Sequence, residues 1–300
     1  LVSTRFGETS QIHHVTEPMG MRRQLTFFDE RVGGASWRPG VGGGFLFSRD
    51  TGGDELYQGF LFDIASGSWT RVTEEGSRNG AFVWSADGEQ VAWHRSTTGD
   101  ANWDILLADP DDAEATRRVV LEGEGAMYPS DWSDDGSWIL AGRYYSITHS
   151  DLYRLDLASG ELTEILPDQD VAYGAVEIAP DGESVYAVTD MLGEFRRVVR
   201  IDLGSQEVAP VTPDIAWDVG SIDVSEDGRL MAWTVNEGGI DRLHLMDLTT
   251  GEALSAPDLP VGLIGGLQFD DAGERLGLTF VAATAPADAW VYDLSSGALT

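Results

Sequence analysis

A repeat of 45–48 residues runs along most of this chain and constrains its fold more than any other feature. Its first mark is an apolar residue followed by a short polar turn that ends in glycine, as in the Trp-Ser-Ala-Asp-Gly of residues 84–88. The turn glycines of the six copies are Gly40, Gly88, Gly136, Gly182, Gly228 and Gly273. A fixed period of this length indicates an architecture in which each repeat is one supersecondary unit.

A second, independent mark keeps the same period. It is an apolar strand that ends in Asp and is often followed by a Ser/Thr-Gly turn. The six aspartates, of which the second and fourth belong to weaker copies, are Asp63, Asp109, Asp156, Asp202, Asp247 and Asp293. Asp and Ser side chains bond to their own backbone in turns, and glycine adopts the left-handed conformation that ends a hairpin turn. Both marks therefore predict tight turns between short apolar strands.

The two marks divide each repeat into four short strands, and four-stranded units of about 40–50 residues are typical of propeller blades. We therefore predict an all-β fold, a β-propeller of about seven four-stranded blades that forms a single domain over residues 1–300. Six repeats are complete, and a partial N-terminal blade supplies only its later strands. The expected blades span residues 1–27 (partial), 32–73, 80–120, 127–166, 172–212, 219–257 and 263–300. Because the chain starts at Leu1 in what reads as the middle of a strand, we expect it to be part of a longer protein.

The charge of the chain restricts its partners. The formal net charge is -32, and every basic residue is arginine. Nucleic acids and anionic membranes bind positively charged surfaces, so we expect neither as a partner. No run of 18 apolar residues that could span a membrane occurs. The acidic, lysine-free composition fits either adaptation to high salt or GC-rich coding. The sequence does not determine the cellular compartment, and the cytoplasm is slightly favoured over the periplasm.

Nothing in the chain has the pattern of a catalytic centre. A serine hydrolase of the α/β type needs Gly-x-Ser-x-Gly, which holds the nucleophile on a strained turn, and this pattern is absent. The chain has no cysteine, which excludes thiol nucleophiles, disulfides and cysteine-bound metals. We therefore predict no catalytic residue, no cofactor and no metal site in this chain.

The histidines and one acidic segment invite a metal interpretation, but their patterns favour structural roles. His13 and His14 are neighbours in a predicted strand, so their side chains point to opposite faces. The other three stand alone and are interpreted as partnered structural histidines: His94, His149 and His244. The acidic segment lacks the central glycine and the ligand spacing of a calcium loop, and we interpret it as a solvated turn: Asp109, Asp111, Asp112 and Glu114.

The less repetitive segments lie at the predicted tips between strands. They are residues 50–55, 144–149 and 191–197. Loops on a rigid scaffold are where function usually lies, so these tips are candidate functional segments. The sequence does not show which rim of the propeller is used.

The repeat, Trp-Ser-x-Asp-Gly followed by an apolar strand and then Asp-Leu-x-Ser/Thr-Gly, resembles the repeats of TolB-like propellers and of prolyl oligopeptidase propellers. Four further segments resemble the peptidases: residues 23–30, 215–219, 256–262 and 291–300. Of these, residues 215–219 and 256–262 resemble bacterial members of the acylaminoacyl-peptidase-like branch. The resemblance implies the non-catalytic propeller of a serine peptidase, which docks on and gates its own C-terminal α/β-hydrolase domain beyond residue 300 and admits short peptides. The catalytic residues of the family match no position of this chain.

Two further points come from the resemblance. Dipeptidyl peptidases of the family hold the substrate amino terminus with paired glutamates, and Glu74-Glu75 invites the comparison; we interpret the pair as an exposed acidic turn beside Gly76. The alternative function is a free-standing TolB-like or sensor-type binding propeller for protein or peptide partners.

Overall fold

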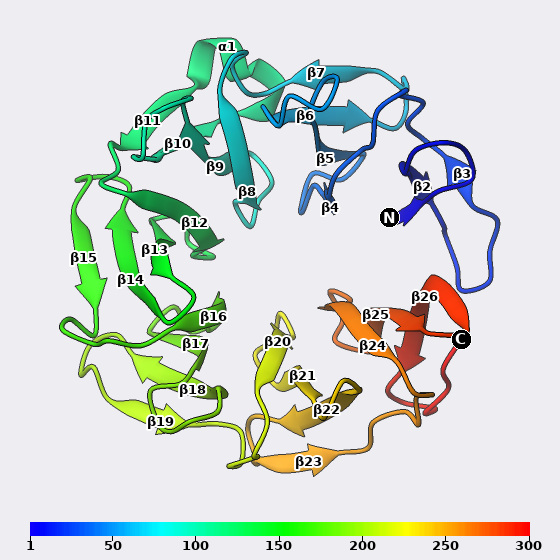
Figure 1. The fold of residues 1–300 in the computed structure, drawn as a ribbon, viewed down its shortest axis with the longest axis vertical. Coiled ribbons are helices and arrows are strands. Elements are labelled where there is room, and N and C mark those ends of the chain that lie inside the picture. The colour runs from blue at the N-terminus through cyan, green and yellow to red at the C-terminus, as the bar shows by residue number, and fades with distance from the viewer. The chain divides into compact units, whose positions relative to one another are not determined.

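The computed structural model describes all 300 residues, and it shows seven antiparallel β-sheets that follow one another along the chain (Figure 1). Each sheet consists of strands that are consecutive in the sequence and hydrogen-bonded in that order. The predicted all-β, seven-bladed propeller is confirmed. We number the sheets blade 1 to blade 7 in chain order.

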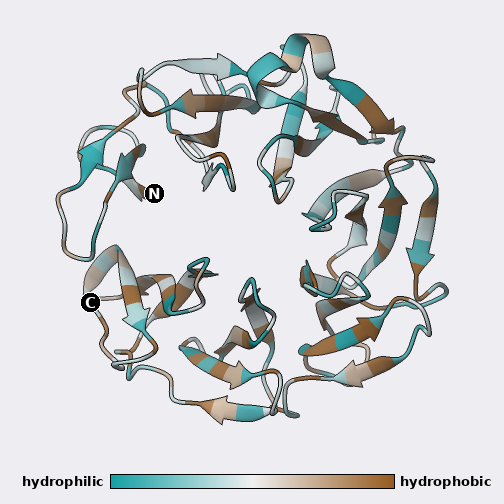
Figure 2. Cartoon of the chain, turned by 180° about the vertical axis from the view of Figure 1, so that it is seen from behind, coloured by the Kyte–Doolittle hydropathy of each residue, from teal (hydrophilic) through white to brown (hydrophobic).

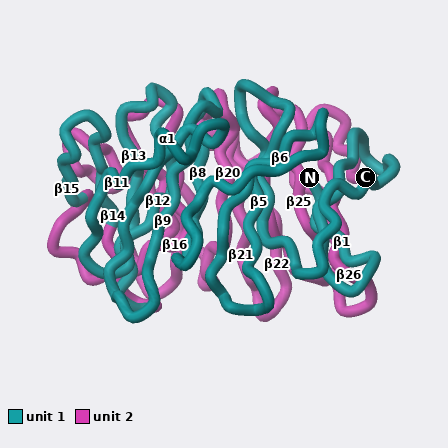
Figure 3. The backbone as a smooth tube through the Cα atoms, turned by 90° about the horizontal axis from the view of Figure 1, so that it is seen from above, with its two compact units in different colours: residues 1–146, 152–164 teal, residues 147–151, 165–300 magenta.

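Contacts divide the chain into two compact units, residues 1–146 with 152–164 and residues 147–151 with 165–300 (Figure 3). The strands of blades 1 to 3 are β1 (Val2–Thr4), β2 (Gln11–His14), β3 (Arg23–Gln24), β4 (Ala35–Trp37), β5 (Gly44–Arg49), β6 (Gln58–Asp63), β7 (Trp69–Arg71), β8 (Arg78–Trp84), β9 (Val91–Ser96), β10 (Asp104–Ala108) and β11 (Arg118–Leu121). The only helices are single turns between β10 and β11, η1 (Pro110–Asp112) and α1 (Ala113–Thr116). Neither is long enough to cross a membrane.

The remaining blades have the same plan. Blade 4 contains β12 (Ala126–Trp132), β13 (Trp138–Ser146), β14 (His149–Asp156) and β15 (Leu162–Ile165). Blades 5 to 7 contain β16 (Tyr173–Ile178), β17 (Ser184–Thr189), β18 (Arg197–Asp202), β19 (Val208–Pro210), β20 (Val219–Val224), β21 (Leu230–Asn236), β22 (Asp241–Asp247), β23 (Glu252–Leu254), β24 (Leu263–Phe269), β25 (Arg275–Ala282) and β26 (Ala285–Asp293). Blade 1 has three strands, as expected for a partial blade. Blade 7 has three regular strands, and a single bridge between Tyr292 and Leu299 stands where the fourth would lie.

The first repeat mark forms the turn between the first and second strands of a blade. The six turn glycines named above all have positive φ, between 63° and 70°, which an L side chain adopts only with strain. In blade 3 the Ser85 hydroxyl donates to Asp87 at 2.6 Å, and the same carboxylate accepts from the Glu89 N–H at 2.9 Å. The Ser hydroxyl and the Asp carboxylate therefore hydrogen-bond to each other, and the carboxylate also accepts from the turn backbone, which is why this short sequence recurs.

The second mark forms the turn between the third and fourth strands. Asp63 accepts hydrogen bonds from the side chain and the backbone of Ser66, and these bonds lower the pKa of its carboxyl. The copy at Asp109 differs because Pro110 follows it. There Asp109 caps η1 by accepting from the Asp111 N–H at 2.9 Å, and the predicted solvated turn is a short helical segment instead.

Apolar side chains fill the space between successive sheets within each unit. One cluster joins Leu46 and Leu61 of blade 2 to Val91 and Trp93 of blade 3, and others join blades 5 to 6 and 6 to 7. The central strands are covered on both faces, and all six residues of β17 are buried. Figure 2 shows hydrophobic residues gathered on strands and hydrophilic residues in many turns. This burial supplies most of the favourable free energy of folding.

Two carboxylates tie neighbouring blades of the second unit together. Glu177 accepts from the backbone N–H of Val224 at 2.9 Å, and Asp223 accepts from that of Phe269 at 2.5 Å. The two bonds are equivalent by the repeat. Each carboxylate lies one residue before the first residue of the Trp-Ser-x-Asp-Gly-like turn of its own blade, and each N–H donor is the first residue of that turn in the next blade. Burial raises the pKa of Asp223 to about 7 although the Phe269 N–H acts in the opposite direction.

Candidate functional site

Each blade has two ends that differ in chemistry. The two marked turns lie at one end, which we call the turn end. Because antiparallel strands alternate in direction, the hairpin between the second and third strands and the connector to the next blade lie at the other end, which we call the tip end. The three less repetitive segments of the sequence, residues 50–55, 144–149 and 191–197, all belong to hairpins of the tip end.

The two neighbouring histidines contact different aromatic rings. His13 is buried, with Nδ1 3.1 Å from the carbonyl oxygen of Gln11 and its ring at the edge of Phe6. His14 lies at the edge of Trp37, with ring centroids 5.3 Å apart. No group of three or more residues in the chain is arranged to hold a metal ion.

The three single histidines each have a structural partner, as the sequence suggested. His94 stacks on Trp103 at 4.5 Å, and burial lowers its pKa to about 4. His149 lies 3.4 Å from a carboxylate oxygen of Asp151. His244 stacks on Trp233, with ring centroids 5.2 Å apart.

The acidic segment of blade 3 uses its carboxylates locally. Asp109 caps the 3-10 turn, and Asp111 forms a 2.7 Å ion pair with Arg38 of blade 2. Arg38 also donates through Nε to the carbonyl oxygen of Gly88 at 2.7 Å. The segment therefore joins the turn ends of blades 2 and 3.

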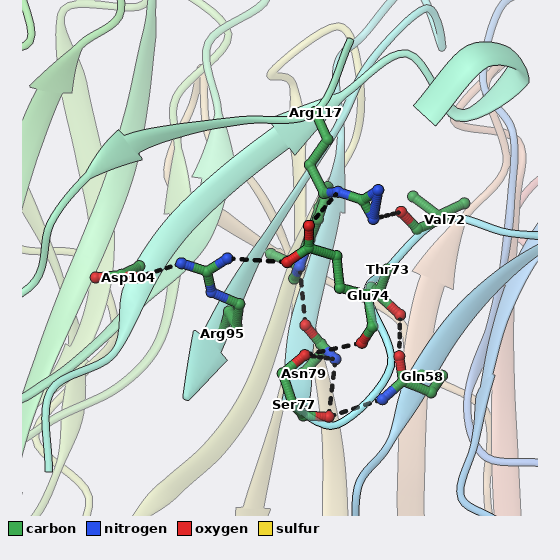
Figure 4. A network of polar contacts seen from close by, with 10 residues as sticks. Gln58, Val72, Thr73, Glu74, Ser77, Asn79, Arg95, Asp104 and Arg117 are labelled. Atoms are coloured by element: carbon green, nitrogen blue, oxygen red, sulfur yellow. Dashed lines mark hydrogen bonds and ion pairs between the residues drawn. The ribbon is translucent and has the colours of Figure 1, made fainter. Parts of the chain in front are cut away.

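The paired glutamates lie in the connector between blades 2 and 3, and both form ion pairs with arginines. Figure 4 shows Glu74 between Arg95 and Arg117. The carboxylate of Glu74 lies 3.2 Å from Arg95 and 3.8 Å from Arg117, and Glu75 pairs with Arg71. Both glutamates, with Arg71 and Arg117, line a pocket of about 330 Å³. Because both carboxylates already have cationic partners, the geometry favours the structural interpretation over binding of a substrate amine.

A buried polar network lies beneath Glu74 and holds the connector in place (Figure 4). The hydroxyl of Thr73 donates to Oε1 of Gln58 at 2.7 Å and accepts from the N–H of Gly59 at 3.0 Å. The Gln58 amide donates to the carbonyl oxygen of Ser77 at 2.7 Å. In other blades the hydroxyls of Thr26 and Thr212 accept from the backbone N–H groups of Ile12 and Val198 in the same way. A threonine with this hydrogen bond is therefore a repeated feature of the fold. Sequence reasoning missed them, although a threonine at the end of the fourth strand was the available signal.

The tip end of the second unit exposes apolar side chains close together. Ile147 is 77% exposed, Trp217 45% and Leu192 42%. Arg196 joins their three segments, because its guanidinium donates to the carbonyl oxygen of Ile147 at 3.1 Å and its N–H donates to Asp218 at 2.8 Å. We call these three apolar residues, with Arg196 and Asp218, the tip patch.

Acidic residues border the tip patch. Asp170, whose side chain is almost fully exposed, lies 3.7 Å from His149, and Asp190 accepts from the Ala172 N–H at 2.9 Å. An apolar centre with a charged border is typical of protein and peptide contact surfaces.

Comparisons with known proteins identify the fold. No protein-family model and no curated protein sequence matches the chain. Among solved structures, a prolyl endopeptidase, described in terms of inter-domain dynamics in catalysis and specificity, matches with a TM-score of 0.80 and 15% identity. The match covers 97% of this chain and 46% of that one, so the chain spans about half of the endopeptidase.

Two further kinds of structure match. Prolyl oligopeptidase B from Galerina marginata, bound to a 25mer macrocyclization substrate, matches with a TM-score of 0.73 and 14% identity over 90% of this chain and 42% of that one. TolB from Acinetobacter baumannii matches with a TM-score of 0.60 and 18% identity over 82% of this chain and 59% of that one. Putative TolB from Agrobacterium tumefaciens matches with a TM-score of 0.60 and 19% identity over 78% of this chain and 83% of that one. The chain is thus a β-propeller whose fold resembles the propeller domain of prolyl oligopeptidases and the propellers of TolB proteins.

Proposed function

We propose that the chain is the non-catalytic propeller domain of a serine peptidase of the prolyl oligopeptidase type. It docks on an α/β-hydrolase domain outside these residues and gates the access of peptides to it. The observation that carries the proposal is the match to a prolyl endopeptidase over 97% of this chain, in which it accounts for 46% of the longer protein. The segments at residues 215–219 and 256–262 favour the acylaminoacyl-peptidase-like branch.

The contrast between the two blade ends supports a docking role for the tip end. At the turn end the same Ser, Asp and Gly residues recur and bond to one another, which leaves a repetitive surface. The tip patch differs, with exposed Ile147, Leu192 and Trp217. Docking would bury these side chains, and aromatic residues such as Trp217 contribute strongly to such contacts.

A gate of this kind acts by exclusion and sequestration. It restricts the hydrolase site to substrates that are short or unfolded, and it keeps the reaction away from bulk solvent. A net charge of -32 also gives the domain a field that attracts cationic peptides and repels anionic ones. The preference for cationic peptides weakens as salt is added, because steering over more than a Debye length is screened.

The alternative is a free-standing binding propeller of the TolB or sensor type. The observation in its favour is that the match to putative TolB from Agrobacterium tumefaciens covers 83% of that chain, so little of it lies outside the shared fold. Against it, the two TolB matches cover 78% and 82% of this chain, less than the 90–97% covered by the peptidases.

A labelling experiment separates the two functions. The isolated 300-residue chain and the full-length gene product are treated with a serine-directed fluorophosphonate probe. The proposal predicts that only the full-length product is labelled and that its additional residues contain Gly-x-Ser-x-Gly. A full-length product without that pattern and without labelling would favour the binding propeller, and labelling of the isolated chain would show that catalysis lies within it.

A further inference from the structure

A pocket of about 610 Å³ lies between blades 5 and 6 in the second unit. One side is the connector that follows β19, at Asp214, and the other is the outer part of blade 6, at Trp233, His244, Ala253 and Leu254. Its volume is within the range of about 300–1,000 Å³ that is usual for small-molecule sites. No role proposed above uses this pocket.

The repeat provides an internal comparison for the pocket, because blade 2 has the same strand register as blade 6. Phe47 pairs with Phe60 as Trp233 pairs with His244. In the outer strand, Trp69 pairs with Phe62 as Ala253 pairs with Met246. Ala253 in β23 therefore occupies the position that Trp69 occupies in β7.

The connectors before the two blades also correspond. Thr26 accepts from the Ile12 N–H, and Thr212 accepts from the Val198 N–H, each through its hydroxyl. Two residues further along the chain stand Phe28 before blade 2 and Asp214 before blade 6.

In blade 2, aromatic rings fill this space. Trp69 packs on Phe28 and Phe60 with ring centroids 5.6 and 5.3 Å apart. The guanidinium of Arg49 lies over the ring of Phe28 at 4.5 Å. The outer-strand indole, 44% exposed, thus packs against both the connector phenyl and the ring of Phe60.

In blade 6, both of these rings are missing. A methyl group replaces the indole at Ala253, and the carboxylate of Asp214 pairs with Arg197. The rings that remain are those of Trp233 in β21 and His244 in β22, which we call the inner layer. They are stacked, with centroids 5.2 Å apart and an interplanar angle of 10°. The pocket is thus the space that an aromatic side chain occupies in blade 2.

The inner layer also contains an unsatisfied hydrogen-bond donor. Nε1 of Trp233 is buried without a partner, and the residue is only 2% exposed. An indole N–H can only donate, and a buried donor without an acceptor is destabilising. Nε2 of His244 is also buried without a partner, and burial lowers the pKa of this histidine.

We propose that this pocket binds the aromatic side chain of an extended peptide segment. The side chain takes the place of the missing indole and stacks against the Trp233–His244 layer, and a backbone carbonyl of the peptide accepts from the Trp233 N–H. A peptide is the occupant that the comparison favours, because the group that fills the space in blade 2 is an indole carried on a β-strand. β23 is the edge strand of its sheet, and all three of its residues are exposed.

The test is a nuclear magnetic resonance titration of the 300-residue chain with N-acetyl-Gly-Trp-Gly-amide, N-acetyl-Gly-Ala-Gly-amide and free indole. We expect the Trp peptide to shift the Ala253 methyl and His244 ring signals saturably, the Ala peptide to leave them unchanged, and indole to bind more weakly. Equal shifts with the Ala peptide would overturn an aromatic site. Indole binding as tightly as the Trp peptide would overturn the role of the peptide backbone.

Two variants with a matched control complete the test. Ala253→Trp recreates the side chain of blade 2 and should abolish the shifts at His244, whereas Thr70→Trp, in the exposed outer strand of blade 2, should leave binding unchanged. Trp233→Phe keeps a ring but removes the N–H, and it should weaken Trp-peptide binding by about two- to tenfold, the usual effect of one hydrogen bond. Undiminished binding to a folded Ala253→Trp variant would refute the site.

Discussion

Asp223 gives the most quantitative prediction, because its carboxyl is buried between blades 6 and 7 and its pKa is raised to about 7. The ordinary value for this group is 3.8. Between these two values the unfolded chain has lost the proton and the folded chain retains it. The contribution of Asp223 is therefore fully present below the unfolded pKa and is lost as pH rises through the folded pKa.

The magnitude follows from the difference between the two pKa values. Each pKa unit corresponds to about 1.4 kcal/mol, so a shift of about three units gives an upper limit on the order of 4 kcal/mol. Because the carboxylate keeps some contact with solvent, we expect about 1–3 kcal/mol to be observed. Asp223→Asn removes the charge and keeps an oxygen that can accept from the Phe269 N–H. It should therefore stabilise the protein at pH 8 more than at pH 5, by about this amount.

The assay is urea unfolding of the wild-type chain and Asp223→Asn at pH 5 and pH 8. A control with the opposite sign is Asp293→Asn, because hydrogen bonds from Ser296 and Ser295 hold the pKa of the Asp293 carboxyl at about 2. Ionised Asp293 stabilises the fold above the unfolded pKa, and that stability is lost as pH falls through about 2, so its replacement should destabilise the protein at both pH values. If Asp223→Asn changes stability equally at pH 5 and pH 8, the reasoning about its burial is wrong.

Two further predictions concern stability. Gly88→Ala should cost more than about 2 kcal/mol, because the residue has φ of 70° and an added Cβ would lie 2.1 Å from the carbonyl oxygen of Pro39. Gly136→Ala, with φ of 70° and nothing within 4 Å of the added Cβ, should cost only about 1–2 kcal/mol, and equal costs by chemical unfolding would contradict the proposed contact. The melting temperature should also rise between about 0.01 and 0.15 M salt, over which the Debye length falls from about 30 to 8 Å, because the net charge is -32. A flat or falling melting temperature in calorimetry would count against self-repulsion.

The strands and turns were predictable because their signals are local. Ser85, Asp87 and Gly88 specify their turn within four residues, and the period then places every copy. The insertion after Asp109 departs from the pattern at Pro110, whose missing N–H and fixed φ suit the first position of a helix.

Contacts between blades and connectors were not predictable, because they join residues that lie from 21 to 73 positions apart in the chain. The sequence shows that Glu74 and Glu75 are adjacent, but it does not show whether their carboxylates form ion pairs. Only the structure shows that Arg95 and Arg117 lie next to Glu74. The pocket between blades 5 and 6 likewise depends on Ala253 standing where blade 2 has Trp69. Once the register is known, this difference is visible in the repeat.

We propose that the propeller gates a peptidase, and a comparison of cleavage rates on two substrates tests this gating. The full-length enzyme is given a short chromogenic peptide and a folded protein that carries the same cleavable sequence in an exposed loop. We expect rapid cleavage of the short peptide and no cleavage of the folded protein until it is unfolded, because a propeller that covers the hydrolase site excludes bulky substrates. Equal rates of cleavage for the two substrates would contradict the gating role.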